Sequence, residues 1–132
     1  MTIQVEDYFR DSVDNWGFTP QEADTDAADN LLVRVNAMFD EALQMDAALS
    51  SGHRTPAKTD ELRKEGYGAV HNDAHEHATG VDVADPLGAA DKAITDEMLT
   101  QYGLYREDPR WTVGWVHLQT NAPGSGHHTF IP

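Results

Sequence analysis

Cysteine is absent from the sequence, which excludes disulfides, thiolate nucleophiles, iron–sulfur clusters and every zinc site with a cysteine ligand. A bound metal would have to be held by histidine and carboxylate side chains. Basic residues are also few, because 9 Lys and Arg stand against 23 Asp and Glu and the formal net charge is −14. Nucleic-acid phosphates would meet like charge on such a surface, so we expect no nucleic-acid partner.

Long apolar runs are missing as well. No stretch approaches the roughly 20 apolar residues of a membrane-spanning helix, so we expect no membrane insertion. Residues 1–8 lack the basic segment and apolar run of a secretory signal, and we predict none. Lysine occurs only three times, which is typical of proteins adapted to high salt and equally of ordinary acidic surfaces. The length allows one modest core and predicts a single domain over residues 1–132.

The first half of the chain is predicted to be mainly helical. Residues 1–24 mix aromatic and acidic side chains with a glycine and a proline, which predicts an irregular lead-in whose rings dock on the core. Between about 26 and 46, apolar residues recur at helical spacing and predict a helix with one buried side. Residues 47–51 are predicted to form a strand, and Thr59 is expected to cap a short helix that ends by Gly66.

The second half is predicted to contain short strands between helices. The elements are a strand over 80–86, a helix over 89–102 that ends at Gly103, a charged loop over 106–110, a strand over 115–119, a turn over 121–126 and an edge strand over 127–132. Together they predict an α+β fold with a small, mostly antiparallel sheet flanked by helices.

Histidine is abundant, with seven residues in the chain, and three of them fall within one acidic segment. This segment holds His71, His75 and His77 beside Asp73, Glu76 and Asp82. Two or more imidazoles and a carboxylate can build a zinc site, but a solvated acidic loop has the same composition. A ligand pair at His71 and His75 would need a helix, which Gly66 and Gly68 disfavour.

Further motifs stand on either side of this segment. In order they are Ser51 to Pro56 (SGHRTP), Ala74-His75, Gly80 to Pro86 (GVDVADP) and Trp115 to Gln119 (WVHLQ). In order and spacing they resemble the zinc D-alanyl-D-alanine carboxypeptidases and their phage endolysin relatives. In that family an SGYR-type strand end precedes a histidine with an aspartate seven residues later, and a Trp-x-His strand closes the site. His75 and Asp82 have this separation, and the resemblance covers roughly residues 48–132.

The resemblance implies a zinc metallopeptidase with a hedgehog/DD-peptidase-like fold. Its ligands for Zn²⁺ would be His75, Asp82 and His117. Asp82 and His117 fit this role, because each lies on a strand-like segment from which it can project toward a common point. Two imidazoles and one carboxylate would leave a position on the metal for water. Arg54, which matches the SGYR arginine, would bind a substrate carboxylate or stabilise the oxyanion; a surface salt bridge is its alternative role.

The chain departs from the family pattern around the first histidine. Asp73 stands where a small hydroxyl residue is usual, and Ala78 stands in place of the usual glycine. An alternative register starts at His77, but Ala84 then stands where the aspartate should be. We therefore prefer His75 as the ligand.

The general base is missing from its usual place. Many family members carry Glu or Asp three residues before the last histidine, but this position is Gly114 here. Peptide hydrolysis needs a group that takes and returns the proton of the attacking water. The acids considered for this role are Glu107, Asp108, Glu76 and Asp73. We select Asp108 as the catalytic acid–base.

The other histidines and the tryptophans receive structural interpretations. His127 and His128 are expected to be solvent-exposed. Trp111 and Trp115 are expected to belong to the core rather than to a substrate-binding wall. His53 replaces the tyrosine of the SGYR motif, and it either lines the cleft or caps the loop.

The resemblance also implies a function and a location. The protein would cleave peptidoglycan cross-links or stem peptides, as a D-Ala-D-Ala carboxypeptidase or an endolysin does, and would be of phage or viral origin. Its partners would be peptidoglycan or another cell-wall peptide and other virion proteins. It would be made in the cytoplasm and act at the cell wall after lysis or within a virion. The alternative, favoured by Gly114, is an inactive structural or adaptor protein of the virion that retains the fold and the metal.

Overall fold

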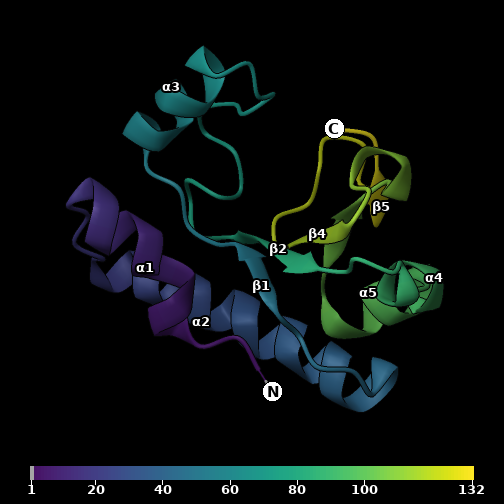
Figure 1. The fold of residues 1–132 in the computed structure, drawn as a ribbon. Coiled ribbons are helices and arrows are strands. Elements are labelled where there is room, and N and C mark those ends of the chain that lie inside the picture. The colour runs from purple at the N-terminus through teal and green to yellow at the C-terminus, as the bar shows by residue number, and fades with distance from the viewer. Residues whose placement is uncertain (1) are drawn as a thin grey trace.

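Residues 2–132 are described by a computed structural model of the chain (Figure 1). One sheet contains, in spatial order, β1 (Leu49–Ser51), β2 (Gly80–Ala84), β4 (Trp115–Gln119), β3 (Tyr105–Glu107) and β5 (Thr129–Phe130). Neighbouring strands are antiparallel except for the parallel pair β3 and β5. The predicted α+β class and mostly antiparallel sheet are confirmed.

Within the predicted irregular lead-in over 1–24, the described residues 2–24 are largely helical instead. Helix α1 spans Val5–Trp16, and helix α2 begins at Glu22. The buried residues of α1 are Tyr8, Phe9 and Ser12, which share one face because residues four apart are neighbours on a helix. The apolar residues of this segment recur at helical spacing, so the sequence did carry a helix signal here. Gly17 then ends α1 in the left-handed conformation at φ 64°.

The predicted central helix is confirmed and is longer than expected at its start. Helix α2 covers Glu22–Ala37 and continues into a π-helical segment over Met38–Leu43. Its early start comes from a capping box, in which the side chains of Gln21 and Asp24 satisfy each other's backbone N–H groups. In Figure 1, α1 and α2 run below the sheet, whereas α3 (Pro56–Lys64) and the C-terminus stand above it.

Two expected helix boundaries are wrong, and side-chain hydroxyls explain both. Thr55, not Thr59, caps α3: its hydroxyl accepts from the Lys58 N–H, and Pro56 occupies the first turn. The predicted helix over 89–102 is divided into α4 (Ala89–Ala93) and α5 (Asp96–Tyr102), because Thr95 caps a new helix. Gly103 ends α5 as predicted.

The charged segment 106–110 is not the loop that we predicted. Its first residues belong to β3, and Pro109–Trp111 forms one 3₁₀ turn. The predicted strand at 115–119 is confirmed over its full length as β4, and those at 47–51, 80–86 and 127–132 are confirmed over the shorter spans of β1, β2 and β5. Across residues 2–132 no helix combines the length and apolar character that a bilayer crossing needs.

The two central strands separate a core face from a polar face. Val81 and Val83 of β2 and Val116 and Leu118 of β4 are fully buried in one apolar core with residues of α1 and α2. Since side chains alternate along a strand, the residues between them point to the other side of the sheet. The candidate site is built on this second face.

Candidate metal centre

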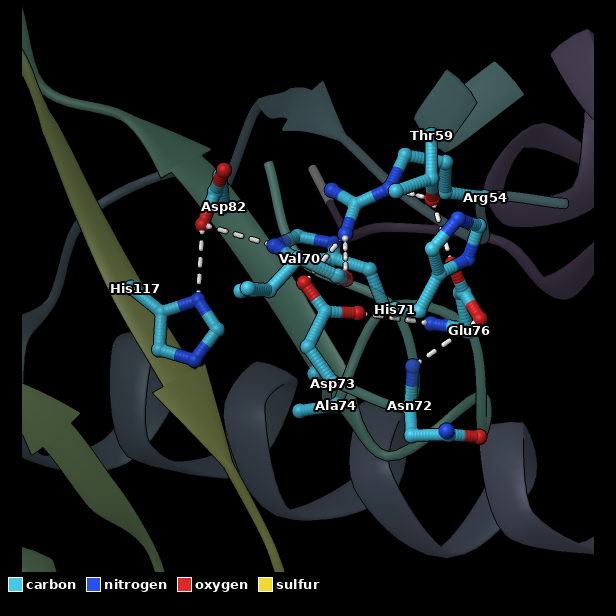
Figure 2. A network of polar contacts seen from close by, with 12 residues as sticks. Arg54, Thr59, Val70, His71, Asn72, Asp73, Ala74, Glu76, Asp82 and His117 are labelled. Carbon is cyan, nitrogen blue, oxygen red and sulfur yellow. Dashed lines mark hydrogen bonds and ion pairs between the residues drawn. The ribbon is translucent and has the colours of Figure 1, made fainter. Parts of the chain in front are cut away.

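Asp82 and His117 occupy directly paired positions of β2 and β4. Paired residues of antiparallel strands project to the same face, so both side chains leave the sheet away from the core. The Nδ1 atom of His117 lies 2.9 Å from Oδ1 of Asp82, and Figure 2 shows this contact across the two strands. The sheet thus fixes two of the three predicted ligands.

His75 reaches the same point from the turns that precede β2. Its Nε2 atom lies 3.3 Å from Oδ1 of Asp82, and the two imidazole rings have their centroids 5.2 Å apart. One ligand atom from each of His75, Asp82 and His117 can be chosen so that all three lie within 4.8 Å of one another. The group can hold a metal ion, and it is the one such group found in the described part of the chain.

A backbone carbonyl fixes the orientation of the His75 ring. Nδ1 of His75 lies 2.8 Å from the carbonyl oxygen of Gly52. Because a carbonyl can only accept, Nδ1 must carry the hydrogen, and a neutral ring then presents the lone pair of Nε2 toward Asp82. The side chain of His75 is therefore prepared to act as a ligand through Nε2.

Helix α1 holds the Gly52 loop in place. The His53 N–H donates to the carbonyl of Tyr8 at 3.0 Å, and the Tyr8 hydroxyl donates to the carbonyl of Gly80 at 2.7 Å. A Cβ atom on Gly52 would clash with the Tyr8 carbonyl oxygen, so the close approach requires glycine. The segment that we expected to be irregular is thus a support for the site.

The charges inside the group favour a cation. Burial alone would raise the pKa of Asp82, but hydrogen bonds from His117 and His75 hold this pKa well below its ordinary value. Burial alone would lower the pKa of His117, but Asp82 raises it above its ordinary value. Asp82 therefore stays ionised between two rings, and either a proton or a metal ion must compensate its charge.

The alternative histidine registers are not realised. His77 is exposed and lies outside the group. His71 does not pair with His75; its ring bridges Asp60 at 2.8 Å and Glu76 at 3.1 Å. The segment 71–78 forms turns rather than a helix, as its glycine-flanked sequence predicts.

Arg54 lies beside the group in a network that orders the turns (Figure 2). Its Nε donates to the Thr59 hydroxyl at 2.8 Å and its Nη2 to the carbonyl of Val70 at 3.1 Å, while the side chain forms an ion pair with Asp73. Its side chain is only 11% exposed, so Arg54 is not the surface salt bridge of its alternative role. These contacts use Nε and Nη2 and do not involve Nη1.

Two of the acids considered for catalysis are occupied by the same network. Asp73 binds Arg54 and also accepts from the Glu76 N–H at 3.0 Å. Glu76 accepts from Thr59 and from the Asn72 N–H. Burial would raise the pKa of Glu76, but these bonds and His71 lower it. Both carboxylates therefore stabilise the turns.

Asp108 is not brought into the metal group. Its carboxylate caps the 3₁₀ turn and binds the Arg110 side chain, with Oδ1 2.9 Å from both the backbone N and Nε of Arg110. Its hydrogen bonds with Arg110 lower the pKa of Asp108 below its ordinary value. The structure thus places the Asp108 carboxylate against Arg110 and outside the metal group.

Glu107 is the acid that faces the group. Strands β3 and β4 pair Arg106 with Leu118, so the antiparallel register brings Glu107 beside His117. Arg106 points to the other face, where it pairs with Asp91 at 2.7 Å. Burial raises the pKa of Glu107, and its charge interacts with His117, Asp82 and His75. No sequence signal separated Glu107 from Asp108, because the face that each side chain takes depends on the register of β3 with β4.

The aromatic and terminal residues differ from expectation in several places. Trp111 is 57% exposed and does not belong to the core. His128 is half-buried: its Nδ1 donates to the Leu104 carbonyl at 2.8 Å and its ring stacks on Tyr105. Phe130 presents its ring to His117 at a centroid distance of 6.5 Å. His127 is exposed as predicted.

His53 turns away from the metal group. Its ring stacks on Phe18 with a centroid distance of 4.4 Å, and its Nδ1 lies 2.8 Å from the Ser12 hydroxyl. It therefore packs against α1 and does not line the site.

Comparison of the chain with protein-family models, with curated proteins and with solved structures gives no match.

Proposed function

We propose that the chain is a zinc-dependent peptidase that cleaves peptide bonds of peptidoglycan, either in cross-links or in stem peptides. The observation that carries the proposal is the convergence of His75 Nε2 and His117 Nδ1 on one oxygen of Asp82, within the motifs that resemble zinc D-alanyl-D-alanine carboxypeptidases and endolysins. Two imidazoles and one carboxylate suit zinc, and three protein ligands are typical of catalytic zinc sites. The hedgehog/DD-peptidase-like fold is part of the same proposal.

Glu107 takes the role of the general base. When bound, zinc acts as a Lewis acid toward the scissile carbonyl and toward the attacking water. The Glu107 carboxylate accepts a proton from that water as its oxygen attacks the carbonyl carbon. The carbon–nitrogen bond then breaks, and Glu107 returns the proton to the leaving amine. Its raised pKa brings the group closer to the value that proton transfer near neutral pH requires.

Arg54 binds the substrate through Nη1. Asp73, Thr59 and the Val70 carbonyl hold the guanidinium from its other side, so the group is positioned before substrate arrives. Nη1 then donates to a substrate carbonyl or carboxylate oxygen. Peptidoglycan or another cell-wall peptide is the partner, and the protein acts at the wall after lysis or as part of a virion beside other virion proteins.

An inactive structural or adaptor protein of the virion is the second candidate, and Gly114 favours it. Gly114 precedes β4 at φ 95°, a conformation that side chains other than glycine adopt with strain. A glutamate at this position would therefore be poorly placed, and the Gly114→Glu variant is expected to remain no more active than the natural protein. If the natural protein is inert and Gly114→Glu is active, the inactive virion protein is the better assignment.

Digestion of purified peptidoglycan tests the proposed activity. We expect the zinc-loaded protein to release new amino termini, detected by mass spectrometry, and we expect His117→Ala and Glu107→Gln to release few. Asp108→Asn is the matched control, since it alters the neighbouring carboxylate on the same segment and should remain active. A natural protein that binds zinc but releases no termini across a broad pH range would support the structural role instead.

A further inference from the structure

We infer that Gln119 is a positioning residue for the proposed metal ligand His117, and that it holds the ring in the tautomer with hydrogen on Nε2, which leaves the lone pair on Nδ1 toward Asp82. The inference rests on the metal-binding part of the proposed function. It does not depend on peptidase activity, because it concerns how the chain prepares a ligand.

The hydrogen bonds around Gln119 can be arranged in only one way. Its Nε2 lies 2.8 Å from the backbone carbonyl of Asn121, which can only accept, so the amide NH₂ must point there. Oε1 of Gln119 therefore faces His117, 2.7 Å from the ring Nε2. A hydrogen bond at this distance requires the hydrogen on Nε2 of His117.

This arrangement determines which nitrogen of His117 is available. A neutral imidazole carries one hydrogen, and with that hydrogen on Nε2 the lone pair lies on Nδ1. Nδ1 is the atom that lies 2.9 Å from Oδ1 of Asp82. Without a fixed acceptor at Gln119, the hydrogen would be free to move to Nδ1 and hydrogen-bond with Asp82, and the ring would then present the wrong nitrogen.

The hydrogen bond between Gln119 and His117 is buried. Gln119 is 7% exposed and His117 is 5% exposed, so water has little access to replace the amide oxygen. The two residues stand two apart on β4 and project to the same face of the sheet. The carbonyl of Gly52 does the same for His75, but it belongs to the backbone. Gln119 is thus the one of the two orienting acceptors that a substitution can remove.

The test measures zinc affinity and the state of the His117 ring in the purified full chain. Gln119→Met keeps the length of the side chain and removes the strong acceptor. Leu118→Met is the matched control, since it introduces the same residue one position away, on the core face. Gln119→Glu keeps an acceptor oxygen. Zinc affinity is obtained by competition with a chromophoric chelator, and long-range ¹H–¹⁵N NMR reports which ring nitrogen carries hydrogen.

We expect Gln119→Met to lose roughly 10- to 100-fold in zinc affinity, the range typical of lost partners of metal ligands. Leu118→Met should stay within about threefold of the natural protein, and Gln119→Glu should keep most of the affinity. In the metal-free natural protein, at alkaline pH where the ring is neutral, the NMR spectrum should show hydrogen on Nε2 of His117. In metal-free Gln119→Met under the same conditions, that single state should be replaced by a mixture of the two tautomers.

The inference is overturned if Gln119→Met binds zinc as tightly as the natural protein with an unchanged His117 spectrum. It is also overturned if Leu118→Met loses as much affinity as Gln119→Met, because general packing would then be responsible. If Gln119→Met does not fold, Gln119→Leu takes its place with the same expected results. A natural chain that binds no zinc overturns the metal site and this inference together, whereas bound zinc without peptidase activity overturns only the proposed activity.

Discussion

Asp82 and His117 face each other across β2 and β4 at a paired register position, and the ring nitrogen lies 2.9 Å from the carboxylate oxygen. Strand pairing sets this distance, so these two candidate ligands are held together by the sheet itself. His75 is held by the turns and by the Gly52 carbonyl instead. The site therefore combines a rigid half on the sheet with a half that depends on the turns over 71–78.

The first prediction concerns the coupling of metal binding to stability. At a free zinc concentration about 100 times the dissociation constant, zinc should stabilise the natural protein by about 2.7 kcal/mol, because it binds only the folded state. His75→Ala and His117→Ala should lose this gain. Thermal unfolding with zinc and with a chelator measures it, and zinc content is measured in parallel.

His77→Ala is the matched control for this experiment. His77 is exposed and lies outside the metal group, two residues from His75. It should bind one zinc per chain and keep the full stabilisation. Loss of zinc from His77→Ala together with unchanged zinc in His75→Ala would reverse the ligand assignment.

The second prediction separates Glu107 from Asp108. Glu107→Gln should lower kcat/KM by about 10²- to 10⁴-fold, the usual effect of removing a general base, while zinc stays bound. Asp108→Asn should change kcat/KM little, because Asp108 binds Arg110 rather than the metal group. Equal losses in both variants would contradict the assignment of Glu107.

The pH dependence of kcat/KM tests the assignment of Glu107 as the general base in a second way. A general base works when deprotonated, so activity must fall as pH falls through its pKa. Burial raises the pKa of Glu107, and the acid limb of kcat/KM is therefore expected at a higher pH than that of an exposed glutamate. An acid limb at or below pH 4 would exclude Glu107 from this role.

The motifs made the grouping of the candidate ligands predictable, whereas the supporting contacts were not visible in the sequence. The seven-residue interval from His75 to Asp82 and the strand pattern around His117 pointed to the three residues that the structure brings together. The choice of Asp108 was based on closeness along the chain, and the structure places its carboxylate against Arg110. The face of the sheet on which the Glu107 side chain lies depends on the register of β3 with β4. This register places Glu107 beside His117.

The contacts by which α1 holds the Gly52 loop could not be predicted from the sequence either. Tyr8 meets Gly52 and Gly80 only in the folded chain, through contacts that no local pattern encodes. The predicted central helix, by contrast, came from a long apolar stripe that needs no tertiary context. Long periodic elements were therefore predictable, and short elements fixed by distant contacts were not.

The third prediction concerns the pair of Arg54 and Asp73. Arg54→Gln should destabilise the metal-free protein by about 1–3 kcal/mol, because Asp73 would be left partly buried without its partner. Urea unfolding of both single variants and the double variant measures the coupling. Arg10→Gln, which breaks an exposed ion pair with Asp7, is the control and should have a much smaller effect. A double variant whose loss equals the sum of the single losses would mean that the pair is not coupled.

The last prediction is the pH dependence of zinc affinity. A protonated imidazole cannot bind zinc, so protons compete at His75 and His117. Since Asp82 raises the pKa of His117 in the metal-free protein, competition at this ring should begin above the ordinary histidine value of about 6.5. The pKa of Asp82 is held well below its ordinary value, so the carboxylate should compete only in strong acid. Affinity should therefore fall with pH, by up to about 100-fold per pH unit once both rings are protonated.

A variant with one imidazole fewer makes this slope interpretable. His117→Asp keeps three ligands but leaves His75 as the only imidazole, so its affinity should fall by no more than about 10-fold per pH unit over the same range. Both titrations belong at high ionic strength, where the net charge of −14 attracts divalent cations least. An affinity of the natural protein that does not change between pH 5 and 7 would mean that carboxylates alone hold the metal. His75 and His117 would then have to be abandoned as ligands, whatever the activity of the protein.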